Sequence, residues 1–267
     1  MSGAATVGTV FEKARAEGRA ALVGYLPAGF PTYDRCIDAI KVMMAAGVDL
    51  VEVGLPYSDP VLDGPTIQAA AEIALRGGTR TADVLHTVEA VTTAGGIAVV
   101  MTYWNPVLRY GVHRFARDLA AAGGAGLITP DLTPDVAAEW IRASDDTDLA
   151  RIFLVAPSSS DARLAMTAAA CRGFVYAASV MGVTGAREST SAVAPALVAR
   201  IRAVSSLPVG VGLGVSSGAQ AAVIAEYADG VIVGSALCRD LLDTTDQQDA
   251  LAGLRRLVED LAAGVRG

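Results

Sequence analysis

The 267-residue sequence has few cysteines, histidines, aromatic side chains and charged residues. Its three cysteines, Cys36, Cys171 and Cys238, are far apart and form neither a disulfide framework nor a paired metal motif. Its two histidines are too few for a metal site or for a base beside a nucleophile. We therefore expect no metal and no cofactor, and we interpret the cysteines as buried thiols in a reducing cytoplasm.

Long apolar runs are also missing, although the mean hydropathy is +0.44. The apolar runs at 97–101 and 231–233 have the length of strands, whereas a membrane span needs about 18 apolar residues. The first 18 residues lack the basic start and apolar stretch of a signal peptide. The sequence thus favours a cytoplasmic protein with no membrane segment.

Positive charge is in deficit, with 21 Lys and Arg against 28 Asp and Glu, which gives a net charge of −7. A broad nucleic-acid surface needs the opposite balance. Two Trp and five Phe also offer little material for base stacking. We therefore expect no nucleic-acid partner. Hydrophobic residues make up 52% of the chain, which is enough to exclude intrinsic disorder.

What the sequence does contain is a series of short apolar runs that alternate with helical patterns. We expect strands at 21–26, 50–53, 98–101, 126–129, 152–155, 174–177, 209–211 and 230–233. We expect helices at 33–46, 66–75, 82–93, 112–122, 134–143, 162–170, 192–204, 218–225 and 248–263. This alternation is typical of βαβ units with parallel strands.

Eight such units predict a single (β/α)8 barrel, the TIM-barrel fold, formed by residues 1–267 as one domain. One extra helix, at 7–17, precedes the first strand, and a short one, at 236–241, follows the eighth. An open doubly wound sheet is the alternative, but it usually has a Gly-rich turn after its first strand. Here that strand continues into Pro27-Ala28-Gly29-Phe30-Pro31, which is not such a turn.

In a barrel, reactive residues gather at the carboxyl ends of the strands. Because strand side chains alternate, an inward Leu50 implies an inward Glu52 near the end of the second strand. An apolar cavity would raise the pKa of that carboxyl and suit it to proton transfer, although Glu52 could also be a structural residue bonded to nearby backbone. Asp59 and Asp63 follow in the same loop, and for each residue taken alone a turn-forming role is the favoured interpretation.

Two Gly-rich segments, 210–217 and 234–235, follow the seventh and eighth predicted strands. Barrels often bind phosphate at these loops, next to the amino terminus of a short helix. Backbone N–H groups would hold the anion without Lys or Arg, so an acidic protein can bind it; plain turns are the other interpretation. The small, polar segment 179–190 after the sixth strand has the length of a lid.

Several motifs, in order along nearly the whole chain, resemble the tryptophan synthase alpha chain family. They are VEVGLPYSDPVLDGPTIQ (51–68), MTYWNPVLRYG (101–111), GLITPDLTPD (126–135), MGVTGAR (181–187), VGVGLGVSS (209–217) and GVIVGSA (230–236). The first is highly specific, whereas other phosphate-binding barrels share the glycine motifs. The resemblance implies a lyase of tryptophan biosynthesis that cleaves indole-3-glycerol phosphate to indole and glyceraldehyde 3-phosphate in a retro-aldol reaction. It also implies a beta chain partner in an α2β2 heterotetramer.

The resemblance also implies residue roles. Glu52 would be the general acid/base, and Asp63 would accept a hydrogen bond from the indole N–H and stabilise the positive charge that develops. The substrate would contact Tyr25, Tyr103, Tyr176, Thr184, Gly185, Gly214, Gly234 and Ser235, with the three glycines and Ser235 at the phosphate. Thr184 would close on Asp63 as a latch. Pro56 and Asp59 lie in the segment that touches the beta chain in relatives.

Two other functions stay open at this stage. One is another phosphate-binding barrel enzyme, such as a sugar-phosphate isomerase or synthase, which would usually place a Lys or Asp at a strand end. The other is a catalytically silent subunit that only activates a partner enzyme. Loss of Glu52 or Asp63 would mark the silent subunit, and both residues are present.

Overall fold

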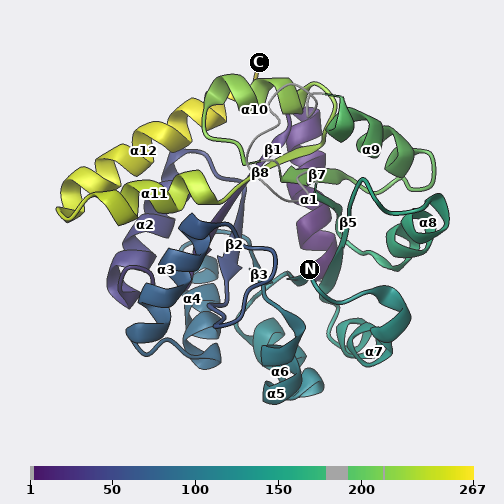
Figure 1. Ribbon diagram of the computed structural model, residues 1–267, viewed down its shortest axis with the longest axis horizontal. Helices are drawn as coiled ribbons and strands as arrows, with labels where there is room; N and C mark the ends of the chain where they lie inside the picture. The colour runs from purple at the N-terminus through teal and green to yellow at the C-terminus, as the bar shows by residue number, and fades with distance from the viewer. Residues whose placement is uncertain (1–2, 179–191, 213) are drawn as a thin grey trace.

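Eight parallel strands close into a barrel in chain order, and helices surround it (Figure 1). The computed structural model describes residues 3–178, 192–212 and 214–267. The strands are β1 (Ala21–Pro27), β2 (Leu50–Gly54), β3 (Ala98–Met101), β4 (Gly126–Thr129), β5 (Ala150–Val155), β6 (Val175–Ala178), β7 (Val209–Gly212) and β8 (Gly230–Val233). The prediction of a (β/α)8 barrel is confirmed, and each expected strand is found within two residues of its expected bounds.

The helices also follow the predicted order. They are α1 (Gly3–Ala16), α2 (Tyr33–Ala46), α3 (Pro65–Arg76), α4 (Thr81–Thr93), α5 (Trp104–Tyr110), α6 (Val112–Ala121), α7 (Ala138–Asp146), α8 (Asp161–Ala170), α9 (Val193–Arg202), α10 (Gly218–Ala225), α11 (Ser235–Asp243) and α12 (Gln247–Gly264). The expected extra helices are α1 and α11. Across the described ranges, every helix is too short or too polar to cross a bilayer.

Two helical segments differ from the prediction. The helix α5 was not expected, because seven residues make only two turns and Pro106 lies in the first of them, so no helical period can be recognised. The single helix expected at 134–143 is instead a 3-10 turn, η1 (Pro134–Val136), followed by α7. Pro134 is compatible with the first turn of a helix, but the α-helix begins only four residues later.

The alternation of side chains along β2 is as expected. Leu50 packs in the barrel interior with Val23 and Val99, whereas Val51 and Val53 belong to the layer between strands and helices. Glu52 therefore points into the barrel, one level above Leu50. In the strand register it lies between Tyr25 of β1 and Val99 of β3.

The amino-terminal end of the barrel is filled by α1, which lies behind the strands in Figure 1. Val7, Val10 and Phe11 of this helix join the interior cluster, and the Phe11 ring centroid lies 5.1 Å from that of Phe174. Apolar side chains thus close this end. A site inside the barrel must open at the carboxyl ends of the strands, where enzymes of this fold place their chemistry.

Candidate active site

Glu52 is a carboxyl group almost completely removed from water, with 1% of its surface exposed. Burial raises its pKa from 4.5 to about 8, and the charge of Asp63 contributes further in the same direction. Its Oε2 atom is buried without a hydrogen-bond partner among the described residues. A carboxyl retained only for structure normally has its buried oxygens bonded, so these surroundings favour the proton-transfer interpretation.

Asp63 lies in the segment between β2 and α3 and is half-buried. Burial raises the pKa of its carboxyl, while a side-chain hydrogen bond with Tyr103 lowers it. Its backbone carbonyl accepts a hydrogen bond from Gln68 Nε2 at 2.7 Å. The residue therefore combines a turn position with a carboxyl that interacts electrostatically with Glu52.

Three tyrosines predicted for the site surround this carboxyl pair. Tyr25 comes from β1, Tyr176 from β6 and Tyr103 from the junction of β3 and α5. Burial raises the pKa of Tyr25 and Tyr176 well above 10, and the charges of both carboxyls add to the effect. Both hydroxyls therefore remain neutral and able to donate hydrogen bonds at neutral pH.

Glycines at the ends of β2 and β7 make room for two of these rings. A Cβ atom added at Gly212 would lie 2.7 Å from Tyr176 Oη, and one at Gly54 would lie 2.6 Å from Tyr25 Cε2. Neither distance is compatible with a side chain at the glycine position. Sequence reasoning placed Gly212 in a phosphate-binding loop and gave no reason to single out Gly54, since both packing roles depend on rings from other strands.

The expected phosphate site has two of its segments in the described structure. Gly214 has a φ of +66°, a backbone conformation that favours glycine. Gly234 precedes α11 without a side-chain cap, and a Cβ added there would lie 3.3 Å from Tyr25 Cδ1. The amino terminus of α11 is thus next to the tyrosine and carboxyl cluster, where an anion can supply the missing cap. Thr184 and Gly185 lie outside the described residues.

Three further residues, each linked to a predicted site residue or to its neighbour in the chain, were not predicted from the sequence. Tyr57 packs on Tyr103 with ring centroids 5.1 Å apart. Asp131 accepts hydrogen bonds from the Trp104 N–H with both carboxylate oxygens, at 2.9 and 3.1 Å. Cys238 of α11 has a pKa raised to about 12, first by burial and then by the charges of Cys36 and Asp63. Of the three residues, only Cys238 had a signal in the sequence. It lies three residues after the expected phosphate segment, and this position could have indicated that it is close to the site.

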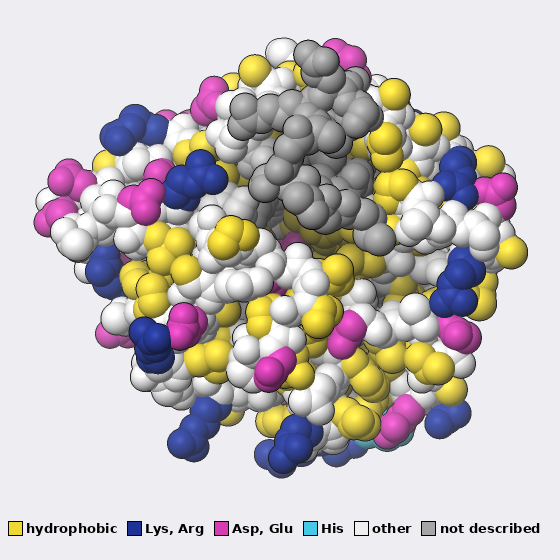
Figure 2. Space-filling model, in the orientation of Figure 1, with side chains coloured by type: hydrophobic (Ala, Val, Ile, Leu, Met, Phe, Trp, Pro, Cys, Tyr) yellow, Lys and Arg dark blue, Asp and Glu magenta, His cyan; other side chains and the backbone are white. Residues whose placement is uncertain are grey.

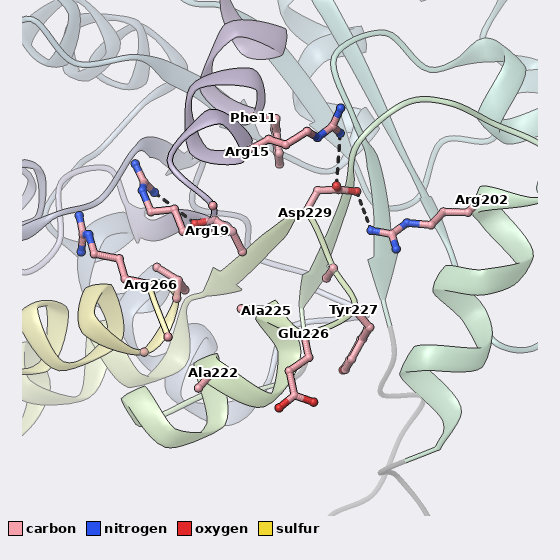
Figure 3. Close-up of a pocket in the computed structure, with 16 residues that line it drawn as sticks. Phe11, Arg15, Arg19, Arg202, Ala222, Ala225, Glu226, Tyr227, Asp229 and Arg266 are labelled. Atoms are coloured by element: carbon pink, nitrogen blue, oxygen red, sulfur yellow. Dashed lines mark hydrogen bonds and ion pairs between the residues drawn. The ribbon is translucent and has the colours of Figure 1, made fainter.

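A separate hollow of about 410 Å³ lies at the amino-terminal end of the barrel (Figure 3). Arg15 and Arg202 point toward the Asp229 carboxylate in its wall, and each lies 3.3 Å from it. Asp229 also accepts a hydrogen bond from the Val209 N–H at 2.9 Å. The Asp229 carboxylate thus pairs with two guanidinium groups, and the hollow contains none of the predicted site residues.

The described residues contain no group of three or more His, Cys, Asp or Glu side chains arranged to hold a metal ion. The chemistry that these side chains offer is instead that of two carboxyls in different surroundings, one fully buried and one half-buried. Such a pair can divide acid/base work between its members.

Comparison with known proteins identifies the family. The family model described as tryptophan synthase alpha chain matches residues 11–266. The tryptophan synthase alpha chain of Acidothermus cellulolyticus is 63% identical over 260 residues, which is 97% of each chain. That of Mycobacterium tuberculosis strain H37Rv is 62% identical over 266 residues, covering all of this chain and 96% of the relative.

Solved structures agree with the sequence matches. A structure of Mycobacterium tuberculosis tryptophan synthase superimposes with a TM-score of 0.91 and 61% identity over 98% of both chains. Tryptophan synthase subunit alpha from Legionella pneumophila, at 29% identity, has a TM-score of 0.90 over 99% of this chain and 98% of its own. The chain described here therefore belongs to the tryptophan synthase alpha chain family.

Proposed function

We propose that Glu52 and Asp63 are the acid/base pair with which this chain cleaves indole-3-glycerol phosphate. The chain is a lyase of tryptophan biosynthesis, as its family membership establishes. The observation that carries the residue assignment is the buried Glu52 carboxyl, with an unpartnered oxygen and a pKa of about 8 beside Asp63. A carboxyl that is largely protonated near neutral pH can give up a proton and take it back.

In the proposed mechanism, the Glu52 carboxyl donates its proton to indole C3. The ring then carries a positive charge at N1, which the Asp63 carboxylate stabilises by accepting the N1–H hydrogen bond. The bond between C3 and the side chain breaks, and its electron pair returns to the ring and neutralises N1. The side-chain hydroxyl loses its proton to the Glu52 carboxylate and becomes the aldehyde, so Glu52 is restored.

The phosphate would be held by backbone N–H groups of Gly214, Gly234 and Ser235, with Gly185 completing the set. The amino terminus of α11 supports this proposal, because aligned peptide dipoles favour an anion there. Tyr25, Tyr103 and Tyr176 would line the indole and glycerol portion of the pocket, and Thr184 would close on Asp63. No Lys or Arg is needed in this arrangement, which suits a chain with a net charge of −7.

The beta chain is the family's partner, and we propose an α2β2 assembly in the cytoplasm, with residues 1–267 acting as one domain. A groove of about 430 Å³, lined in part by Pro56, Tyr57, Asn105 and Arg109, lies beside the proposed site. Exposed apolar side chains follow three strands: Val61 and Leu62 after β2, Leu108 in α5 after β3, and Val136 in η1 after β4. Figure 2 shows apolar side chains gathered between the charged groups of the face in view. These features support docking through Pro56 and Asp59.

Release of indole from indole-3-glycerol phosphate, with and without a beta chain, tests the proposal. We expect Glu52→Gln to lose cleavage by orders of magnitude while its folding stays intact, and Asp63→Asn to be severely slowed. Glu259→Gln, an exposed substitution on α12, is the matched control. Parental turnover by Glu52→Gln would overturn the acid/base assignment. No indole release by the parent, with the partner still activated, would favour a silent subunit.

A further inference from the structure

The segment that carries Asp63 has little apolar packing of its own. It lies between β2 and α3, and its neighbouring side chains, Val61 and Leu62, are 76% and 55% exposed. Side chains that face water contribute little to fixing a backbone. The position of the Asp63 carboxyl must therefore depend on polar contacts.

Gln68 holds the Asp63 carbonyl, and a second side chain, Tyr103, binds two backbone N–H groups directly before Asp63. Its hydroxyl oxygen accepts hydrogen bonds from the Val61 N–H at 3.1 Å and the Leu62 N–H at 2.9 Å. The same hydroxyl is close enough to the Asp63 carboxyl to act as a hydrogen-bond donor and lower its pKa. A tyrosine hydroxyl has one proton to donate and accepts hydrogen bonds through its lone pairs. The Tyr103 hydroxyl can therefore act as a donor and as an acceptor at the same time.

Tyr103 is itself held in place from two sides. It is 5% exposed and packs on the Tyr57 ring. The next residue, Trp104, begins α5, and its N–H is bound by both carboxylate oxygens of Asp131, which follows β4. The first N–H groups of a helix lack partners within the helix, and a carboxylate there is favoured by the helix dipole. Asp131 thus fixes the start of α5 directly beside Tyr103.

We propose that Tyr103 and Asp131 are positioning residues for the reaction: Tyr103 holds the Asp63 carboxyl toward the Glu52 side of the site, and Asp131 holds Tyr103. The inference rests on the proposed role of Asp63. It adds a chain of contacts that runs from the loop after β4, through the start of α5, to the segment after β2. Neither residue needs to touch the reacting atoms in this arrangement.

The charged and titratable groups facing Asp63 come from several elements. They are Tyr25 of β1, Glu52 of β2, Tyr103, Tyr176 of β6 and Cys238 of α11. Among the described residues, Tyr103 is the group whose hydrogen bond lowers the pKa of Asp63, whereas burial raises it. Removing the hydroxyl should therefore raise the pKa of Asp63. The acid limb of the pH–rate profile should move to higher pH.

Tyr103→Phe tests the first contact in the chain, with the isolated alpha chain and indole-3-glycerol phosphate. We expect kcat to fall about 10- to 100-fold, the size expected for one hydrogen bond to a charged group, with the acid limb shifted upward. Tyr110→Phe is the matched control, because it removes a hydroxyl of α5 that binds Asp118 at 2.7 Å, away from Asp63. The control should retain the parental rate and profile.

Substitutions of Asp131 test the second contact. Asp131→Ala should slow the reaction and shift the acid limb in the same direction, whereas Asp131→Asn, which can still accept from the Trp104 N–H, should restore part of the rate. Because Asp131 acts through Tyr103, the double variant Asp131→Ala with Tyr103→Phe should have a kcat only slightly below that of Tyr103→Phe alone. A merely structural role would lower the melting temperature without moving the acid limb.

Asp63→Asn shows whether a negative result concerns the proposed function of Asp63 or only the positioning role of Tyr103. If Asp63→Asn cleaves at the parental rate, the proposed function of Asp63 is wrong. If Asp63→Asn is inactive but Tyr103→Phe matches Tyr110→Phe in rate and pH profile, the positioning role of Tyr103 is wrong. Fully multiplicative losses in the double variant would overturn the role of Asp131.

Discussion

Asp63 raises the pKa of Glu52 beyond the effect of burial, although it is itself only half-buried. The two carboxyls lie eleven positions apart in the chain, on β2 and in the segment that follows it. Glu52 has lost almost all contact with water, whereas Asp63 keeps some and gains a hydrogen bond from Tyr103. The difference in surroundings separates their pKa values, so one can hold a proton while the other is charged.

This coupling predicts how Glu52 titrates when the charge of Asp63 is removed. We expect a midpoint near pH 8 for Glu52 in the parent and a lower midpoint in Asp63→Asn, because a neighbouring negative charge disfavours ionisation. Carbon-13 NMR of labelled glutamate side chains measures the midpoint without needing activity. Asp243→Asn, at the exposed end of α11, should leave it unchanged. An unaltered midpoint in Asp63→Asn would contradict the coupling.

The same raised pKa predicts a basic limb in the rate profile. Glu52 must be protonated to donate to indole C3, and the protonated fraction falls as the pH rises through about 8. The value of kcat/KM for indole-3-glycerol phosphate should therefore decline above that pH in the isolated chain. Steady-state rates across pH 6 to about 10 would measure it. A profile that stays flat to the alkaline end would argue against proton donation by Glu52.

Burial of Glu52 also predicts a cost in stability. Between about pH 4.5 and 8, the unfolded chain loses the Glu52 proton while the folded chain keeps it, so folding becomes less favourable as the pH rises. Glu52→Gln has no charge to bury, so its free energy of unfolding should exceed that of the parent by a margin that grows across this window. The part of this margin that depends on pH should approach about 5 kcal/mol above pH 8.

Urea unfolding at several pH values, followed by circular dichroism, measures that margin. Glu259→Gln removes an exposed carboxyl and should show no comparable pH-dependent gain. An increase in stability together with a loss of activity would identify Glu52 as a residue kept for function, since natural active sites often sacrifice stability. A margin that does not change with pH would mean that Glu52 is not protonated in the folded state.

The sequence predicted most of the fold because the local signals agree with the global arrangement. Alternation along Leu50, Val51, Glu52 and Val53 requires only the period of a strand, and it placed Glu52 correctly inside the barrel. The helix α5 was missed because two turns containing a proline carry no recognisable period. Its start depends instead on Asp131, a contact across 27 positions that no local pattern reveals.

The candidate site shows the same division between local and distant signals. Motifs after β2, β7 and β8 indicated the carboxyls and the Gly-rich segments. The roles of Gly54, Tyr57 and Asp131 could not be predicted, because each consists of a contact with a residue from another strand or loop. Such contacts follow from barrel closure, which brings neighbouring strand ends together only after folding.

Gly234 offers a test of phosphate binding at α11. Gly234→Asp would add a carboxylate at the helix N-cap, where it is a good cap but competes with a phosphate for the same dipole. We expect KM for indole-3-glycerol phosphate to rise at least about tenfold, with an unchanged or higher melting temperature. Gly234→Ala separates size from charge, because its Cβ would lie 3.3 Å from Tyr25 Cδ1. Equal effects of the two variants would mean that crowding of Tyr25, and not charge, is responsible.

Gly212 offers a test of the packing that holds Tyr176 beside the carboxyls. A methyl group at this position would lie 2.7 Å from Tyr176 Oη and 3.0 Å from Cε1, so Gly212→Ala must displace the ring. We expect kcat to fall about tenfold and the free energy of unfolding to fall by about 1 to 3 kcal/mol, as overpacked sites do. Gly8→Ala on α1 has nothing within 4 Å of the added carbon and should instead stabilise the chain by about 1 kcal/mol.

The double variant Gly212→Ala with Tyr176→Phe then separates displacement of the ring from loss of the hydroxyl. Removing Oη deletes the closest contact, so the stability of the double variant should recover toward that of Tyr176→Phe alone. If its activity stays as low as that of Tyr176→Phe, the hydroxyl itself is needed for cleavage. Full additivity of the two losses in stability would contradict the contact between Gly212 and Tyr176, because substitutions that share a contact do not act independently.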